Sequence, residues 1–201
     1  GAWAGRPVWL FASTRDGEEP LLLDAWARGR DGFGCAPILM LVPRHPQRFD
    51  EVARLIEQRG LACLRRSRGQ WPAAAPPADA VLLGDTLGEM PLYYGAADVA
   101  LIGGSLRDFG AQNLIEACAV GTPVVLGPSV FNFAQAAADA VACGAALQVA
   151  DADQALAAMA RLVADPGRLA AMRAAALAFA GAHRGATART VRTLIEMLNN
   201  R

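Results

Sequence analysis

The segment of residues 103–116 combines a glycine turn with polar side chains at helical spacing. It reads Gly-Gly-Ser-Leu-Arg-Asp-Phe-Gly-Ala-Gln-Asn-Leu-Ile-Glu and follows the apolar run 98–102. Gly103 and Gly104 have no side chain, so an anion could approach their backbone N–H groups. A helix that begins near Gly110 would add free amides and the positive end of its dipole. The segment therefore predicts a phosphate or nucleotide pocket.

Two polar residues of the expected helix share one face, because Asn113 and Glu116 are three positions apart. The Asn113 amide can donate to an oxygen, and the Glu116 carboxylate can accept from a pair of ribose hydroxyls. The rest of this helix is apolar, and a buried carboxylate without a partner would be costly. Glu116 thus favours a binding role, although the glycine pair alone also fits a tight strand-to-helix turn without any ligand.

The composition predicts one domain with a substantial hydrophobic core and without a strong overall electrostatic field. The chain has 201 residues, 54% of them hydrophobic, and its 19 basic side chains balance 19 acidic ones. A protein with a net charge of zero does not attract nucleic acid or an anionic membrane by its overall charge, so no nucleic-acid partner is expected. The densest basic cluster, Arg65, Arg66 and Arg68, fits either a local phosphate site or a solvated loop.

Cysteine and histidine usage argues against a metal site. The four cysteines are widely spaced without a Cys-x-x-Cys pair, and the two histidines are His45 and His183. Reduced thiols in a cytosolic domain are the simplest interpretation. The sequence shows neither a membrane span nor a signal peptide. Because residue 1 is not methionine, we expect an excised domain in which residues 1–5 are a linker or a tag.

Short apolar runs alternate with helical patterns along the chain, which is typical of an α/β fold with a doubly wound, Rossmann-like parallel sheet. The expected strands cover residues 8–12, 38–42, 61–66, 80–83, 99–102, 124–126 and 146–149. The expected helices cover residues 17–30, 46–59, 88–97, 111–120 and 132–143. From residue 151 to the end the pattern is helical, with breaks at 165–167 and 181–185.

Ligands of open parallel sheets bind beyond the carboxyl ends of the strands, so the residues after each apolar run are the candidate site. The first run leads into residues 13–19, which lack the Gly-x-Gly-x-x-Gly of dinucleotide-binding folds and so argue against hydride transfer. The second run leads into Pro43-Arg44-His45-Pro46, which supplies a cation and an imidazole or is merely a capped turn. Residues 84–91 and 127–133 follow two further strands.

These segments occur together in an order typical of one family. Residues 13–19, 43–46, 84–90, 103–105, 112–116 and 127–133 resemble the C-terminal half of a bacterial 3-deoxy-D-manno-octulosonic acid (Kdo) transferase, a glycosyltransferase of the GT-B type. The resemblance runs from about residue 6 to the end. It implies that this half binds the donor, CMP-Kdo. It also implies that a missing N-terminal domain binds the lipid A precursor at the inner membrane surface and carries the catalytic carboxylate base.

The resemblance also implies roles for particular residues. Pro43 and Arg44 would flank the cytosine, Glu116 would bind the ribose, and Asn113 would hold the phosphate together with backbone amides near 88–90 and 103–105. The complete predicted substrate-binding set is Ser13, Thr14, Arg15, Pro43, Arg44, His45, Gly88, Glu89, Met90, Gly103, Gly104, Ser105, Asn113 and Glu116. No metal or cofactor is implied. Two positions depart from the family pattern, since Ala111 stands where many members have glycine and Arg15 where others have histidine.

The sequence thus predicts a single nucleotide-sugar-binding domain over residues 1–201, with C-terminal helices over 151–201. It would belong to an inverting Kdo transferase of lipopolysaccharide biosynthesis at the cytoplasmic face of the inner membrane. One alternative is a GT-B transferase or epimerase domain that uses a UDP-sugar. Another is a non-catalytic nucleotide-binding module.

Overall fold

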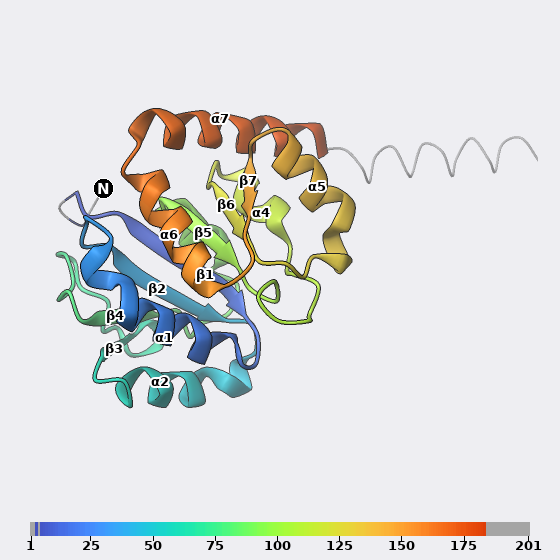
Figure 1. The fold of residues 1–201 in the computed structure, drawn as a ribbon. Coiled ribbons are helices and arrows are strands. Elements are labelled where there is room, and N and C mark those ends of the chain that lie inside the picture. Colours follow the sequence, from blue (N-terminus) through green and yellow to red (C-terminus); the bar gives the residue numbers. More distant parts are fainter. Residues whose placement is uncertain (1–2, 4, 184–201) are drawn as a thin grey trace, which may run out of the picture.

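A seven-stranded parallel sheet forms the centre of the protein (Figure 1). The computed structural model describes residue 3 and residues 5–183. The strands are β1 (Val8–Thr14), β2 (Ile38–Pro43), β3 (Ala62–Arg65), β4 (Ala80–Leu83), β5 (Val99–Ile102), β6 (Val124–Leu126) and β7 (Ala146–Gln148). Their order is β3-β4-β2-β1-β5-β6-β7, and every adjacent pair is parallel. The predicted doubly wound α/β fold is confirmed.

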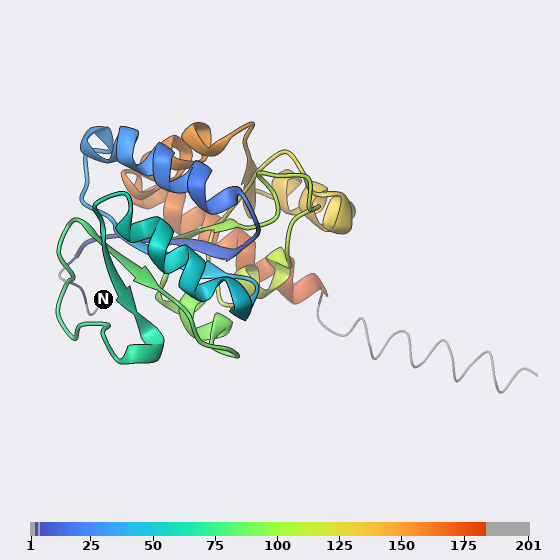
Figure 2. The same cartoon turned by 90° about the horizontal axis from the view of Figure 1, so that it is seen from below.

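Helices cover both faces of the sheet. They are α1 (Glu18–Gly29), α2 (Phe49–Glu57), α3 (Met90–Ala96), α4 (Leu114–Ala119), α5 (Ala134–Ala142), α6 (Ala152–Val163) and α7 (Pro166–His183), with short 3-10 turns at Arg30–Gly32, Pro46–Arg48, Arg66–Arg68 and Phe131–Phe133. Helices α1, α2 and α6 pack on one face, and α3, α4, α5 and most of α7 pack on the other. Figures 1 and 2 show α1 beside α6, and the Arg28–Asp153 ion pair joins these two helices.

Alternation of side chains along the strands builds the two cores. Trp9, Phe11 and Leu41 face the layer of α1, α2 and α6, whereas Leu10 and Met40 face the opposite layer. All five are fully buried. Because both sheet faces are covered, the central strands are continuous apolar runs, and this is why the sequence revealed them. Because all the strands are parallel, their carboxyl ends lie at one edge of the sheet.

The helix expected to begin near Gly110 starts four residues later, at Leu114. Gly110 and Ala111 have φ angles of 76° and 64°, in the left-handed region that a right-handed helix excludes. This conformation folds the chain back over the glycine turn, so that the Ala111 amide donates to the Gly104 carbonyl. The positive φ at position 111 also explains why glycine suits this position in the family pattern, although this chain has alanine there. The predicted break at 181–185 was wrong for residues 181–183, which are helical and belong to α7, and its remainder lies outside the described residues.

The order of the strands reverses between β1 and β5, whose ends approach closely. A Cβ added to Gly103 would lie 2.3 Å from the Ser13 carbonyl oxygen and 2.6 Å from the Thr14 Cα. Ser13 itself has a φ of 56° where the β1–β2 register shifts. Glycine is therefore required at position 103 by the packing of one backbone on another, at the switch point where such folds bind ligands.

Replacing this glycine should disrupt the switch point. We expect Gly103→Ala to lower the free energy of unfolding by about 2 kcal/mol or more, because the added methyl overlaps backbone that side-chain motion cannot relieve. Gly95→Ala is the matched control, since Gly95 is exposed in α3 and a Cβ there meets nothing within 4 Å. The control should gain about 0.5–1 kcal/mol from helix propensity. Urea denaturation measures both, and equal stability of the two variants would contradict the proposed overlap.

Candidate functional site

A cavity of about 300 Å³ lies at the carboxyl ends of β1 and β2. The end of β1, the end of β2, the loop between β4 and α3, and the start of α4 form its walls. It brings together seven of the predicted residues, which are Ser13, Pro43, Arg44, Gly88, Met90, Asn113 and Glu116. Val42, Thr86, Leu87, Tyr94 and Gln112 complete the lining. We call this cavity the switch-point pocket.

One wall of the switch-point pocket carries a proline and an arginine. Pro43 is the buried last residue of β2, and Arg44 follows it with an exposed side chain. The Arg44 backbone amide donates to the Thr14 carbonyl at 2.9 Å, and its Nε donates to the Gln112 Oε1 at 3.2 Å. No ion pair joins Arg44 to a carboxylate among the described residues. Its guanidinium can therefore stack on a base or pair with an anion.

The start of α4 contributes to the pocket a carboxylate that an amide holds. The Asn113 Oδ1 accepts from the Ile115 backbone N–H at 3.0 Å and caps α4, while the Asn113 Nδ2 donates to the Glu116 Oε1 at 3.0 Å. The amide nitrogen keeps a second hydrogen for a ligand. The expectation that Glu116 is buried was wrong, because its side chain is exposed toward the pocket. Its oxygens are accessible as hydrogen-bond acceptors.

The turn at Gly88–Met90 is fixed from behind by the Glu89 side chain. Glu89 accepts from the Arg66 guanidinium, from the Thr86 hydroxyl and from the Tyr93 hydroxyl, the last at 2.9 Å. Donation by Arg66 foremost, with Thr86 and Tyr93, lowers the pKa of Glu89 to about 2. Glu89 is absent from the pocket lining. It holds the turn in place, while Gly88 and Met90 face the cavity.

Four predicted contact residues, Thr14, Gly103, Gly104 and Ser105, are buried, do not line the pocket and bind protein partners. Thr14 donates its hydroxyl to Glu19, the Gly103 amide donates to the Ala12 carbonyl, and the Ser105 hydroxyl accepts from the Gly127 amide. Direct contact of these groups with a phosphate is therefore not supported. They connect the turns that form the walls.

A buried residue next to the site that the predicted set did not include is Glu18, which is 1% exposed. Its Oε2 accepts from the backbone N–H groups of Arg15 at 2.8 Å and Gly104 at 2.6 Å, and its Oε1 accepts from that of Leu106 at 2.9 Å. Backbone amides of the glycine turn thus already bind a carboxylate of the protein itself. The two acidic residues directly after Gly17 were the available signal, because carboxylates at the start of a buried helix need donors.

Glu19, the neighbour of Glu18, makes a buried ion pair. Arg48 donates to both of its carboxylate oxygens, at 2.8 and 3.0 Å, and Thr14 donates to Oε1. Burial raises the pKa of Glu19, although Thr14 and Arg48 act in the opposite direction. The pair ties the turn after β1 to the turn after β2, and so it fixes the segment that carries Arg44 and His45.

Arg15 and His45 lie beside the switch-point pocket without lining it. The Arg15 guanidinium stands 4.5 Å from the centre of the Phe109 ring and has no ion pair with a described carboxylate. Burial, together with the charges of Arg15, Arg44 and Arg48, lowers the pKa of His45. His45 is thus kept neutral by burial and by the positive field of the neighbouring arginines.

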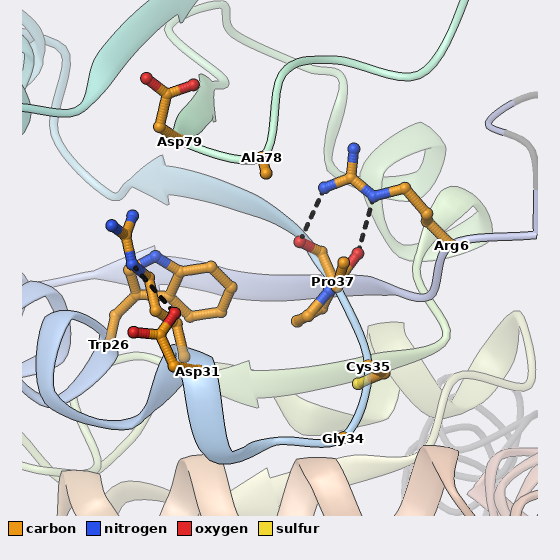
Figure 3. A pocket seen from close by; sticks show the side chains of 10 residues that line it. Arg6, Trp26, Asp31, Gly34, Cys35, Pro37, Ala78 and Asp79 are labelled. Carbon is orange, nitrogen blue, oxygen red and sulfur yellow. Dashed lines mark hydrogen bonds and ion pairs between the residues drawn. The ribbon is translucent and has the colours of Figure 1, made fainter.

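Another cavity, of about 490 Å³, lies at the amino ends of the strands (Figure 3). Arg6 precedes β1, Pro37 precedes β2 and Asp79 precedes β4, so this cavity is at the opposite edge from the predicted residues. The Arg6 guanidinium donates to the carbonyls of Ala36, Pro37 and Pro76. With these bonds, Arg6 fastens three loops together and has a structural role.

Residue 3 and residues 5–183 contain no group of three or more His, Cys, Asp or Glu side chains placed to hold a metal ion. Across the same residues, no helix combines the length and the apolar character needed to cross a membrane.

Comparison with known proteins places this geometry in a family. The model for "Glycosyl transferases group 1" matches residues 78–179. A 3-deoxy-D-manno-octulosonic acid transferase of Bordetella pertussis is 52% identical over 98% of this chain and 47% of its own length. The Haemophilus influenzae protein of the same name is 40% identical over 64% of this chain and 29% of its own length. The chain thus spans less than half of these curated relatives.

A solved structure gives the same result. The crystal structure of the C-terminal CMP-Kdo binding domain of WaaA from Acinetobacter baumannii superposes with a TM-score of 0.78. The two sequences are 32% identical, over 88% of this chain and 90% of that domain. Both the fold and the sequence lead to one conclusion: the chain belongs to the group 1 glycosyl transferases and, within them, to the family of 3-deoxy-D-manno-octulosonic acid transferases.

Proposed function

We propose that this chain is the donor-binding part of a Kdo transferase and that the switch-point pocket binds the CMP portion of CMP-Kdo. The observation that carries the proposal is the convergence of Pro43, Arg44, Asn113 and Glu116 on one cavity at the reversal of strand order. Such points are where open α/β sheets bind nucleotides. The similarity to a domain described as CMP-Kdo binding supports this choice of nucleotide.

Each wall suits one part of the nucleotide. Cytosine would lie against Pro43 and the planar guanidinium of Arg44. The ribose hydroxyls would donate to Glu116, whose carboxylate Asn113 already orients. The phosphate would meet the Gly88–Met90 turn and the positive field of Arg44 and Arg15, and these groups would stabilise the charge of the departing CMP. The chemistry proposed requires no metal or cofactor.

The rest of the enzyme would supply the acceptor. An acceptor hydroxyl on the lipid A precursor attacks the anomeric carbon of Kdo, the bond from that carbon to the phosphate oxygen breaks, and CMP departs with inversion. The base that takes the hydroxyl proton would be a carboxylate of an N-terminal domain. We place the reaction in lipopolysaccharide biosynthesis at the cytoplasmic face of the bacterial inner membrane. The isolated chain should therefore bind the donor without transferring Kdo.

Nucleotide choice is the direct test of this function. Calorimetry on the 201-residue chain should give a dissociation constant for CMP on the order of micromolar to millimolar, because one half of a cleft encloses the ligand incompletely. UDP should bind at least about tenfold more weakly. Tighter binding of UDP would favour a UDP-sugar transferase or epimerase, and binding of neither would favour a module with another ligand.

The ribose contact can be tested by removing one charge. Glu116→Gln keeps the shape of the side chain and loses a charged acceptor, so CMP affinity should fall about tenfold or more. Glu57→Gln makes the same change at the exposed last residue of α2, which does not line the pocket, and should leave affinity unchanged. If Glu116→Gln alters stability but not affinity, Glu116 is structural and the ribose assignment is wrong.

Replacement of Arg44 by lysine distinguishes stacking on the base from a purely electrostatic contact. Arg44→Lys keeps the positive charge but loses the planar face and the Nε that donates to Gln112, so CMP should bind about three- to tenfold more weakly. The decrease should persist in 0.5 M salt, where roughly 4 Å of screening length suppresses the purely coulombic part. Equal affinity of the lysine variant would leave Arg44 as a point charge only.

A further inference from the structure

We propose that the Glu18 carboxylate is a built-in anion that fills a backbone amide nest and thereby positions the donor pocket. The proposal rests on the proposed function, since the pocket that it positions is the one assigned to CMP. Glu18 would touch neither the nucleotide nor the sugar. It is a positioning residue, and it acts through the turns after β1 and β5.

The nest is made of backbone donors from two turns. The Arg15 amide belongs to the turn after β1, whereas the Gly104 and Leu106 amides belong to the turn after β5. All three point at one carboxylate that is 1% exposed. No ion pair balances Glu18 among the described residues, in contrast to Glu19, which Arg48 neutralises. The charge of Glu18 is thus stabilised by amide dipoles, as a phosphate is in glycine-rich loops.

The nest is connected to both walls of the switch-point pocket. The carbonyls of Gly103 and Gly104 accept from the amides of Gln112 and Ala111 and thereby hold the segment before α4. Gln112 in turn accepts from the Arg44 guanidinium at 3.2 Å. Displacement of the β5 turn would therefore move the Arg44 side chain and the start of α4 together.

The nest also determines where the donor phosphate cannot bind. Because Glu18 already occupies the Gly104 and Leu106 amides, a phosphate there would compete with a covalently attached carboxylate and meet its negative charge. The leaving phosphate must use the Gly88–Met90 side of the pocket instead. Glu18 thus excludes the donor phosphate from the amides of the glycine turn.

Removal of the side chain tests the nest by chemical rescue. Glu18→Ala leaves three buried donors without an acceptor, so its melting temperature should fall, and formate should raise it saturably. Sodium chloride at equal ionic strength should not, and neither salt should stabilise the wild type in this way. CMP affinity should drop about tenfold or more in the variant and recover with formate. No difference between formate and chloride would overturn the proposal.

An isosteric variant covers the case in which Glu18→Ala does not fold. In Glu18→Gln either orientation of the amide places an NH₂ group against at least one backbone donor, so CMP affinity should again fall about tenfold or more despite unchanged packing. The backbone amide NMR signals of Gln112 and Ile115 should shift as well. Unchanged signals and affinity would contradict a positioning role. Glu57→Gln is again the matched control.

NMR of the wild-type protein provides a further test. Its Gly104 amide proton should resonate far downfield and exchange slowly with solvent, because it donates at 2.6 Å to a buried carboxylate. A random-coil shift with fast exchange would overturn the nest. If the wild type fails to bind CMP, the proposed function fails alone, because the formate rescue and the amide signals do not depend on any nucleotide.

Discussion

The turns around the pocket depend on the satisfaction of two buried carboxylates at the start of α1. Burying a charge is costly unless donors surround it, and here the cost is offset by donors that lie on different turns. Glu18 draws together the turns after β1 and β5, and Glu19 with Arg48 draws together the turns after β1 and β2. Because neither carboxylate can stay buried alone, the loops at this edge of the sheet have one stable arrangement.

Close backbone contact is the second constraint. The β5 turn packs so tightly on β1 that only glycine fits at position 103, and left-handed residues on either side, Ser13 and Ala111, allow the chain to change direction within a few residues. A non-glycine residue in this conformation costs of order 1–3 kcal/mol and persists only where its surroundings hold it. The hydrogen bonds from Ala111 and Gln112 to the glycine carbonyls provide such support.

Charges are distributed so that the arginines at the site have no ion pair with a described carboxylate. Neighbouring carboxylates neutralise Arg48, Arg65 and Arg66. The ion pairs of Arg65 and Arg66 indicate that the basic cluster is largely structural. Arg15 and Arg44 have no ion pair with a described carboxylate, and they lie where strand order reverses. A net charge of zero is thus compatible with unpaired cations at the site, because several acidic groups neutralise the framework arginines instead.

The sequence alone determined the sheet, most helices and the family, because buried strands are apolar runs and the segments after them keep their order along the chain. It also placed Pro43, Arg44, Asn113 and Glu116 in one site, since residues after neighbouring parallel strands meet at one edge. Only the tertiary structure showed that the glycine-turn amides are occupied by Glu18, that Glu116 is exposed and that α4 starts at Leu114. The acidic pair after Gly17 indicated that buried donors were needed, but two of the donors to Glu18 lie 86 and 88 positions away, so the sequence did not show which they are. The left-handed dihedral angles at Ala111 likewise depend on long-range packing.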